Sequence, residues 1–188
     1  MYNSTVSNIV LDLDKSDIVS TLGLQWNPNT DGLQYSVSFK HSQNVTKRII
    51  LSEISKIFDP LGLVSPVVVN AKLLMQKVWQ SQLEWDELLP SDIQESWLKC
   101  VNATTQLNSL KVPRHVITIN QPQIYELHGF CDASEKAYGA CIYIRATNKE
   151  GEVSSNLLCS KSKVAPLKAT TLPRLELSGA LLLAQLYA

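Results

Sequence analysis

The first third of the chain alternates apolar and polar residues in a way that predicts a β-hairpin. One strand is expected over 22–26 and the other over 33–39, where every second residue is apolar. The intervening segment 28–32, Pro-Asn-Thr-Asp-Gly, is typical of a turn because its residues favour tight backbone conformations. The pattern therefore places an antiparallel pair of strands near the start of the chain.

Three segments with apolar residues at helical spacing follow the hairpin. The first is expected to begin near Thr46, and the second has Ser65 as its N-cap with Pro66 at the first helical position. Ser91 and Gln94 have the spacing of a capping box at the start of the third. The residues predicted to form the apolar stripes are Ile50, Ile54, Ile57, Val67, Ala71, Leu74, Val78, Trp79, Ile93, Trp97 and Val101.

The C-terminal part returns to a strand pattern after a linker predicted over 111–124, which contains two prolines. A helix is expected to begin at Thr171 or Leu172. The strands that precede it are predicted over 125–131, 138–144 and 153–160. The order β-β-β-α indicates an antiparallel meander followed by a helix, so the whole chain is assigned to the α+β class.

Length and composition set modest bounds on the class of protein. The 188 residues suffice for one or two small domains, and 45% hydrophobic residues can build a core. The four cysteines form no Cys-x-x-Cys pair, which argues against a zinc site or a disulfide framework. No apolar run is long enough to span a membrane, and no signal peptide is present. We therefore expect an intracellular protein, in a cytoplasmic particle or the nucleus, that is neither secreted nor bound to a membrane.

Charge is balanced over the whole chain, with 17 basic and 17 acidic residues, but it is unevenly distributed. Between 153 and 175 there is no acidic residue, and there are four cations: Lys161, Lys163, Lys168 and Arg174. Such a stretch is either a solvated basic loop or a surface that binds phosphate groups. The charge pattern alone leaves both interpretations open.

Two carboxylates are notable because of their surroundings. Asp132 comes at the end of a predicted strand, and Glu176 is the only charged residue after Arg174. The leucine-rich sequence around Glu176 predicts a helix buried on nearly all sides, where a carboxylate needs a cationic partner. Two carboxylates on a strand and a packed helix can converge on Mg²⁺, which prefers oxygen ligands. The alternatives are that Asp132 is an ordinary turn residue and that Glu176 is exposed.

Ordered motifs along the chain resemble one known family. The segment 127–140, which contains Phe-Cys-Asp-Ala-Ser and Tyr-Gly-Ala, resembles the opening of the ribonuclease H domain of retrotransposon Pol polyproteins. The segments 159–166 and 172–177 resemble later parts of that domain. Upstream, 22–26 and 54–66 are similar to the stretch after the polymerase palm. Together the motifs look closest to the BEL/Pao group of retrotransposons, also classified as the Pao retrotransposon peptidase family.

This resemblance implies a division of the chain into three sections. Residues 1–110 would be the C-terminal segment of a reverse transcriptase, with palm-end, thumb and connection-like elements. The linker over 111–124 would follow, and 125–188 would be the first half, β-β-β-α, of an RNase H-like fold. The rest of the Pol polyprotein would then be a partner of this chain.

The resemblance also implies roles for individual residues. Asp132 and Glu176 match the first two catalytic carboxylates of a ribonuclease H site. In the intact domain they would bind Mg²⁺ or Mn²⁺ and position a water that cuts the RNA strand of an RNA–DNA hybrid. Lys161, Lys163 and Arg174 are candidate contacts to the phosphates of that hybrid or of another nucleic acid.

Two departures from the family pattern lead us to expect a fragment. The family's remaining metal carboxylates lie downstream, yet none of the twelve residues after Glu176 is Asp, Glu or His. The polymerase's paired aspartates are also missing, so we expect little or no activity from this chain alone. The alternative is a degenerate or domesticated copy that only binds nucleic acid or protein. Aspartic peptidase activity is rejected because the chain has no Asp-Thr-Gly or Asp-Ser-Gly triplet.

Overall fold

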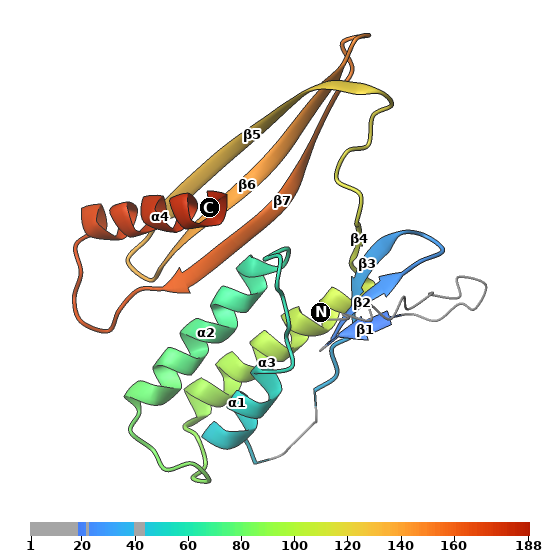
Figure 1. The fold of residues 1–188 in the computed structure, drawn as a ribbon. Helices are drawn as coiled ribbons and strands as arrows, with labels where there is room; N and C mark the ends of the chain where they lie inside the picture. The colour runs from blue at the N-terminus through green and yellow to red at the C-terminus, as the bar shows by residue number, and fades with distance from the viewer. Residues whose placement is uncertain (1–18, 22, 40–43) are drawn as a thin grey trace, which may run out of the picture.

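The computed structural model describes residues 19–21, 23–39 and 44–188. Leu22, the first residue of the first predicted strand, and residues 1–18 of the predicted reverse-transcriptase segment lie outside the described residues. Figure 1 shows short N-terminal strands beside three helices, and a long three-stranded sheet that carries a fourth helix. The fold is therefore a mixed α+β fold, and it is compatible with an RNase H-like domain.

The predicted N-terminal hairpin is confirmed as β2 (Leu24–Asn27) and β3 (Gly32–Tyr35), which pair antiparallel. The side chain of Asn27 holds the turn, because it accepts hydrogen bonds from the next backbone N–H groups. β1 (Val19–Thr21) pairs with β2, and β4 (Lys111–Pro113) pairs with β3. The result is a four-stranded antiparallel sheet in the order β1-β2-β3-β4.

Two features of this sheet differ from the prediction. The strand expected to reach residue 39 ends at Tyr35. Beyond it, the side chain of Asn108 forms hydrogen bonds with both the N–H and the carbonyl of Val37, so these groups do not pair with another strand. The Asn108 Oδ1 atom accepts from the Val37 N–H at 2.7 Å, and its Nδ2 atom donates to the Val37 carbonyl at 2.9 Å. The start of the predicted linker, Lys111–Pro113, is a strand because β3 offers it a free edge.

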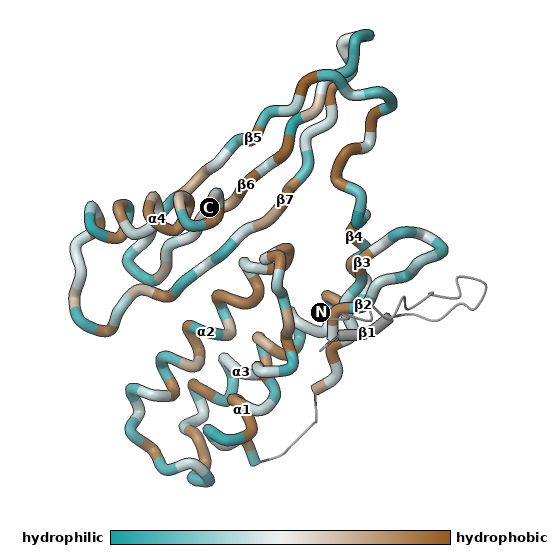
Figure 2. The backbone as a smooth tube through the Cα atoms, in the orientation of Figure 1, coloured by the Kyte–Doolittle hydropathy of each residue, from teal (hydrophilic) through white to brown (hydrophobic). Residues whose placement is uncertain are grey.

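Three helices pack on one another below this sheet. They are α1 (Lys47–Ile54), α2 (Ser65–Gln80) and α3 (Ser91–Thr105), and a 3₁₀ turn, η1 (Gln106–Ser109), follows α3. In Figure 2 hydrophobic residues line the sides of these helices that face one another. The buried core cluster consists of Val45, Ile50, Leu74, Val78, Leu89, Ile93, Trp97 and Val101.

Three local predictions about the helices are wrong. Ile57 lies beyond the end of α1, and Trp79 is 43% exposed rather than part of the α2 stripe. The capping box at Ser91 does not form, because the Gln94 side chain donates to the Leu89 carbonyl instead. The Thr46 N-cap is confirmed: its hydroxyl accepts from the Ile49 N–H.

The order β-β-β-α predicted for the C-terminal part is confirmed. β5 (Pro122–Ala133), β6 (Ala137–Asn148) and β7 (Val153–Val164) form an antiparallel sheet, and α4 (Leu172–Tyr187) follows. Each strand is 12 residues long, longer than predicted, because pairing continues to the turns at both ends of β6. The sheet is therefore a long ribbon that extends well past α4, as Figure 1 shows.

The helical part and the long sheet touch through the loop that precedes α2. The Ser160 N–H donates to the Leu61 carbonyl at 2.9 Å, and the Ser160 hydroxyl donates to the Gly62 carbonyl at 2.5 Å. Gly62 has a φ of +72°, and a Cβ there would lie 1.9 Å from the Ser160 carbonyl oxygen. Only glycine permits this approach, so Gly62 sets the distance between α2 and β7.

The burial predicted for the last helix is wrong. Only Leu175, Gly179 and Leu182 of α4 are buried, whereas Leu177 is 70% exposed and Leu181 is 60% exposed. Figure 2 shows hydrophobic residues on several sides of α4, but the sheet lies against one side only. An apolar sequence around the whole helix therefore did not produce burial around the whole helix, because the described residues supply a single neighbour.

Candidate functional site

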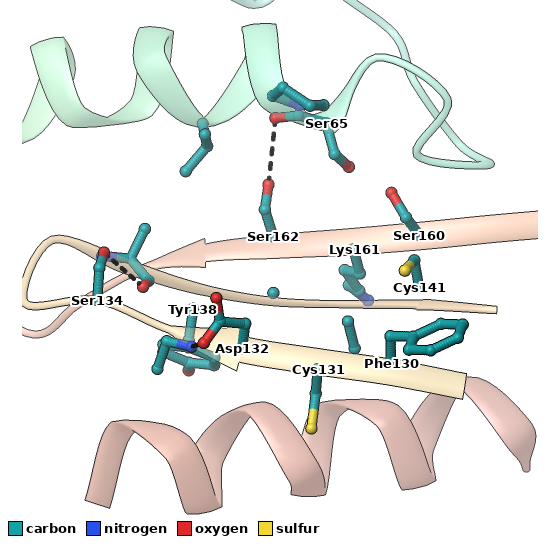
Figure 3. Close-up of a pocket in the computed structure, with 16 residues that line it drawn as sticks. Ser65, Phe130, Cys131, Asp132, Ser134, Tyr138, Cys141, Ser160, Lys161 and Ser162 are labelled. Carbon is teal, nitrogen blue, oxygen red and sulfur yellow. Dashed lines mark hydrogen bonds between the residues drawn. The ribbon is translucent and has the colours of Figure 1, made fainter. Parts of the chain in front are cut away.

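Asp132 lies at the end of β5, one residue before the strand finishes. Its backbone pairs with Gly139, which pairs in turn with Ser162 of β7. The Ser162 hydroxyl donates to the Ser65 carbonyl at the start of α2, so this face of the sheet looks toward α2. Neighbouring Cys131 points to α4 instead, as Figure 3 shows. The exposed Asp132 carboxylate accepts a hydrogen bond of 2.8 Å from the Ala133 N–H.

The turn after Asp132 is held by Ser134. Its hydroxyl donates to the Ala137 carbonyl at 3.1 Å and accepts from the N–H groups of Lys136 and Ala137. The Ser134 N–H also donates to the Ala137 carbonyl at 2.8 Å. These bonds close the β5–β6 turn and hold the backbone that follows Asp132, which makes Ser134 a structural residue of the motif.

Glu176 is brought near the same end of the sheet by the packing of α4. Gly179 lets the helix approach the strands: a Cβ there would lie 3.4 Å from the Asp132 carbonyl oxygen and 3.6 Å from that of Gly139. Glu176 comes three residues earlier, about 4.5 Å along the helix axis at 1.5 Å per residue. The predicted buried environment of Glu176 is wrong, because its side chain is exposed and water meets its solvation requirement.

The two carboxylates share one end of the sheet but reach it from different faces. Asp132 belongs to the face that looks toward α2, while Glu176 is on α4, which covers the other face. Across the described ranges, no group of three His, Cys, Asp or Glu residues is close enough together to hold a metal ion. Asp132 and Glu176 therefore stand as a pair of separate, exposed oxygen donors.

This donor set is chemically suited to a hard divalent cation. Mg²⁺ is commonly held by one or two carboxylates, with water and substrate phosphates completing its coordination. Two thiols of the sheet, Cys141 and Cys159, are poor competitors, because burial raises the pKa of each above the usual value. The chemistry of the site fits Mg²⁺ or Mn²⁺ better than zinc.

Three cations predicted to bind phosphate gather on the α4 side of the sheet. Lys161 and Lys163 alternate with Ser160 and Ser162, whose hydroxyls bond to the α2 side, so the lysines occupy the opposite face. Figure 3 shows Lys161 directed away from α2. All three cations, Arg174 included, are exposed.

Arg174 lies on the side of α4 opposite Leu183. Leu183 comes nine residues later, half a turn away around the helix, and it contacts the position of Gly129 in β5. Arg174 therefore points away from Gly129 of β5. None of these three cations makes an ion pair within the described residues, unlike Arg48, Lys77 and Arg145. Lys161, Lys163 and Arg174 are therefore exposed cations on the α4 side of the sheet, and together they are called the basic cluster.

A cavity of about 470 Å³ lies between α2 and the sheet face that carries Asp132 (Figure 3). Its lining includes Ser65 and Pro66 of α2, and Ser160 and Ser162 of β7. No signal in the sequence indicated this cavity, because Ser65 and Ser162 are 97 residues apart and only the fold brings them together. Asp132 lines the same cavity, so the cavity holds hydroxyl groups as well as the carboxylate.

Comparison with protein families decides the affiliation of the chain. Residues 46–188 match the model of the Pao retrotransposon-like RNaseH-like domain. The chain belongs to this family. The match covers the helices α1–α3 as well as the long sheet, so the Pao-type RNase H-like region includes both parts. No curated protein matches the chain.

One further property concerns membranes. Within residues 19–21, 23–39 and 44–188, none of the helices has the length and apolar character needed to cross a bilayer. The most apolar helix, α4, has 16 residues and carries Arg174 and Glu176.

Proposed function

We propose that this Pao-type region binds an RNA–DNA hybrid at the end of the sheet where β5 and β7 finish and α4 begins. The observation that carries the proposal is that two exposed carboxylates, Asp132 and Glu176, lie at this end of the sheet, while the exposed Lys161, Lys163 and Arg174 lie on its α4 side. Carboxylates alone would repel a polyanion, and cations alone would bind any nucleic acid. The two sets together suit a phosphodiester that is held by the cations and approached by a metal ion.

The cations and the carboxylates would have different roles. Lys161, Lys163 and Arg174 would bind phosphate oxygens and set the position of the strand over α4 and β7. Asp132 and Glu176 would hold Mg²⁺ or Mn²⁺, which would supply charge neutralisation and a more acidic bound water. Ser134 keeps the Asp132 backbone in place through the β5–β6 turn.

We further propose that the chain acts within a retrotransposon Pol polyprotein and binds hybrid without cutting it when alone. Two-metal cleavage needs carboxylates that converge on ions about 4 Å apart. Among the described residues only a pair of separated carboxylates is available, with no third ligand beside them. The strands β1–β3, which precede the matched residues, would derive from the reverse transcriptase part of the same polyprotein.

The first test is binding of a fluorescently labelled RNA–DNA hybrid, followed by anisotropy over a range of salt and Mg²⁺ concentrations. Replacing Lys161, Lys163 and Arg174 by Gln should weaken binding and reduce the logarithmic salt slope by about 3, near 0.9 per phosphate contact. The matched control replaces Lys99, Lys111 and Lys149, which are exposed cations away from this end of the sheet. That control should leave most of the salt slope in place.

The metal part of the proposal is tested separately with Asp132→Asn and Glu176→Gln. Mg²⁺ should strengthen hybrid binding by the natural chain and should have little effect on either variant. If both variants respond to Mg²⁺ as the natural chain does, these carboxylates do not hold the ion. Mg²⁺-dependent cleavage by the purified chain, lost in Asp132→Asn, would contradict the proposal that it binds without cutting.

A second function is favoured by one specific observation, the absence of a third metal ligand among the described residues. A degenerate or domesticated copy would bind nucleic acid, or a protein partner, through the basic cluster alone. Its binding to hybrid would be sensitive to salt, indifferent to Mg²⁺ and unchanged in Asp132→Asn. The same titrations therefore separate the two functions.

A further inference from the structure

Two connections join the N-terminal sheet to the long sheet, and both begin in the β2–β3 hairpin. The first runs from Tyr35, the last residue of β3, through Asp59 to the loop that precedes α2. The second runs from Asp31, in the hairpin turn, through Arg114 to the linker that follows β4. Tyr35 and Asp31 both precede residues 46–188, which match the family model. Residues outside the matched region therefore hold segments that contact the long sheet.

In the first connection, a single carboxylate binds both β3 and the loop. The Tyr35 hydroxyl donates to the Asp59 Oδ1 atom at 2.9 Å, and the Val64 N–H donates to its Oδ2 atom at 3.0 Å. Tyr35 and Val64 are each 3% exposed and belong to the same buried cluster. Hydrogen bonds to a charged group are stronger than those between neutral groups. Asp59 therefore fixes both ends of the loop 59–64 relative to β3.

This loop presents two carbonyl groups to the edge of β7. Ser160 donates to both of them, through its N–H to Leu61 and through its hydroxyl to Gly62. Along an antiparallel strand, successive N–H groups point alternately to one side and to the other. The Ser160 N–H points to the open edge, so the N–H of the next residue, Lys161, points to β6. The Ser160 N–H is therefore a backbone group on β7 that reports directly on the position of the loop.

The second connection begins with a two-point ion pair. The Arg114 guanidinium donates to Asp31 through Nε at 2.5 Å and through Nη2 at 3.1 Å, and the Arg114 N–H donates to the Asp31 carbonyl at 2.9 Å. The same guanidinium lies 5.7 Å from the centre of the Trp26 ring, whose Nε1 donates to the Asp31 carboxylate at 2.9 Å. These contacts hold the start of the linker against the hairpin.

The linker is then bound by the long sheet itself. The Asn156 side chain of β7 donates to the Val116 carbonyl at 2.9 Å, and the Asn148 side chain of β6 donates to the Asn120 carbonyl at 3.4 Å. Figure 1 shows the linker passing from β4 to the start of β5, beside the far end of the long sheet. The segment between the two sheets is therefore attached at both of its ends.

We propose that the β2–β3 hairpin is a two-point clamp that sets where the long sheet lies relative to α1–α3. Asp59 is the positioning residue of one point, and Arg114 is that of the other. The long sheet carries Asp132 and the basic cluster, so the clamp also sets their position relative to the upstream part of the chain. Each point alone restrains the sheet, because two linked attachments raise the effective concentration of one another. This inference does not rest on nucleic-acid binding.

Hydrogen exchange of the complete chain, followed by NMR, tests the first point. Tyr35→Phe removes only a hydroxyl and keeps the packed ring, and it should lower the protection of the Ser160 N–H about tenfold. The protection of the Lys161 N–H should not change. Asp59→Ala, which removes both carboxylate bonds, should lower Ser160 protection further. Tyr125→Phe is the matched control, because Tyr125 is 55% exposed, and it should leave both groups unchanged.

Tryptic cleavage after Arg114 tests the second point. Asp31→Asn breaks the two-point ion pair but suits the local backbone, since Asp31 has a φ of +46° and Asn tolerates positive φ. Cleavage after Arg114 should become about two- to fivefold faster. Cleavage after Lys149, in the β6–β7 turn, is the internal control and should not change. In the double variant with Tyr35→Phe, Ser160 protection should fall by more than the product of the two single effects.

Three results would overturn the proposal. Unchanged Ser160 protection in Tyr35→Phe and Asp59→Ala would mean that the loop keeps its position without Asp59. An equal loss of protection at Ser160 and Lys161 would mean that the substitution destabilises the whole sheet and has no specific effect on its edge. A double variant whose effect equals the product of the single effects would mean that the two connections act independently and form no clamp.

Discussion

Helices α2 and α4 have the same length, 16 residues, and both carry a proline in the first turn, yet they are used differently. α2 packs against α3 on one side and against β7 on another, through the core cluster and through polar bonds. α4 is the more apolar of the two, but among the described residues it packs mainly against the long sheet and leaves Leu177 and Leu181 exposed. The comparison shows that the number of neighbours, not the apolarity of the helix, decides how much of it is buried.

The largest expected loss of stability comes from shortening a side chain in the buried stripe of α4, which consists of Leu175, Gly179 and Leu182. Leu182→Ala should destabilise the chain by about 2–5 kcal/mol, because it removes a fully packed side chain and leaves a cavity. Leu177→Ala on the same helix should cost less than about 0.5 kcal/mol, since that side chain is 70% exposed. Urea denaturation of both variants measures the difference. Similar losses would mean that a surface outside the described contacts covers Leu177.

A second prediction concerns the contact that α2 has and α4 lacks, the approach of its preceding loop to β7. Gly62→Ala should cost about 2–3 kcal/mol, because it combines a positive φ with a clash against the Ser160 carbonyl. Gly151→Ala is the matched control: its φ is also positive, at +81°, but no atom lies within 4 Å of the added Cβ. It should cost about 1 kcal/mol. Equal losses in thermal or urea unfolding would show that the loop contact contributes nothing.

A smaller effect is expected from the polar bonds between α2 and the end of β7. The Gln76 amide donates to the Ala165 carbonyl at 2.7 Å, so Gln76→Ala should cost about 1 kcal/mol. Gln185→Ala on α4 is the paired variant, since Gln185 is exposed, and it should change stability little. Hydrogen exchange of the Ser162 and Ala165 region provides a local check. Unchanged protection there in Gln76→Ala would contradict a role for this bond in holding β7.

The smallest effect involves the exposed ion pair between α2 and α3. The hydrogen bond from the Lys77 ammonium lowers the pKa of Asp92 below its usual value. Any stabilisation from this pair is present at neutral pH and is lost as the pH falls through the lowered pKa. Asp92→Asn should therefore be slightly less stable than the natural chain at neutral pH and equal to it in acid. Thermal melts of Asp92→Asn, Lys77→Gln and the double variant over a pH series test this, and a gap that persists in acid would rule out the ion pair as its cause.

The sequence predicted local structure well where the cause is local. The turn at 28–32, the Thr46 cap and the stripe of Ile93, Trp97 and Val101 are confirmed, because turn chemistry, capping and helical spacing act within a few residues. The capping box at Ser91 failed because Gln94 found the Leu89 carbonyl instead. The strand expected to run to Phe39 stopped at Tyr35 because of Asn108, far away in the chain.

The candidate site shows the same difference between local features, which could be predicted, and features that depend on distant residues. That Asp132 closes a strand and that Glu176 lies early in a helix could be predicted from patterns of residues, and both are found. The exposure of Glu176 could not be predicted, because its leucine neighbours indicated burial. The placement of Lys161 and Lys163 on the α4 side of the sheet could not be predicted either, because it depends on which face of β7 meets α2.

The sequence by itself determined the β2–β3 hairpin, the three helices after it, the β-β-β-α order of the C-terminal part, and the membership in the Pao-type family through residues 46–188. Only the tertiary structure decided which face of the sheet each carboxylate uses, which side of α4 is buried, and which edge of the sheet is covered. The physical reason is the separation along the chain over which each effect acts. Propensity, capping and side-chain alternation act between near neighbours along the chain. Burial and edge pairing depend on groups as far apart as Ser65 and Ser162, which only the completed fold places together.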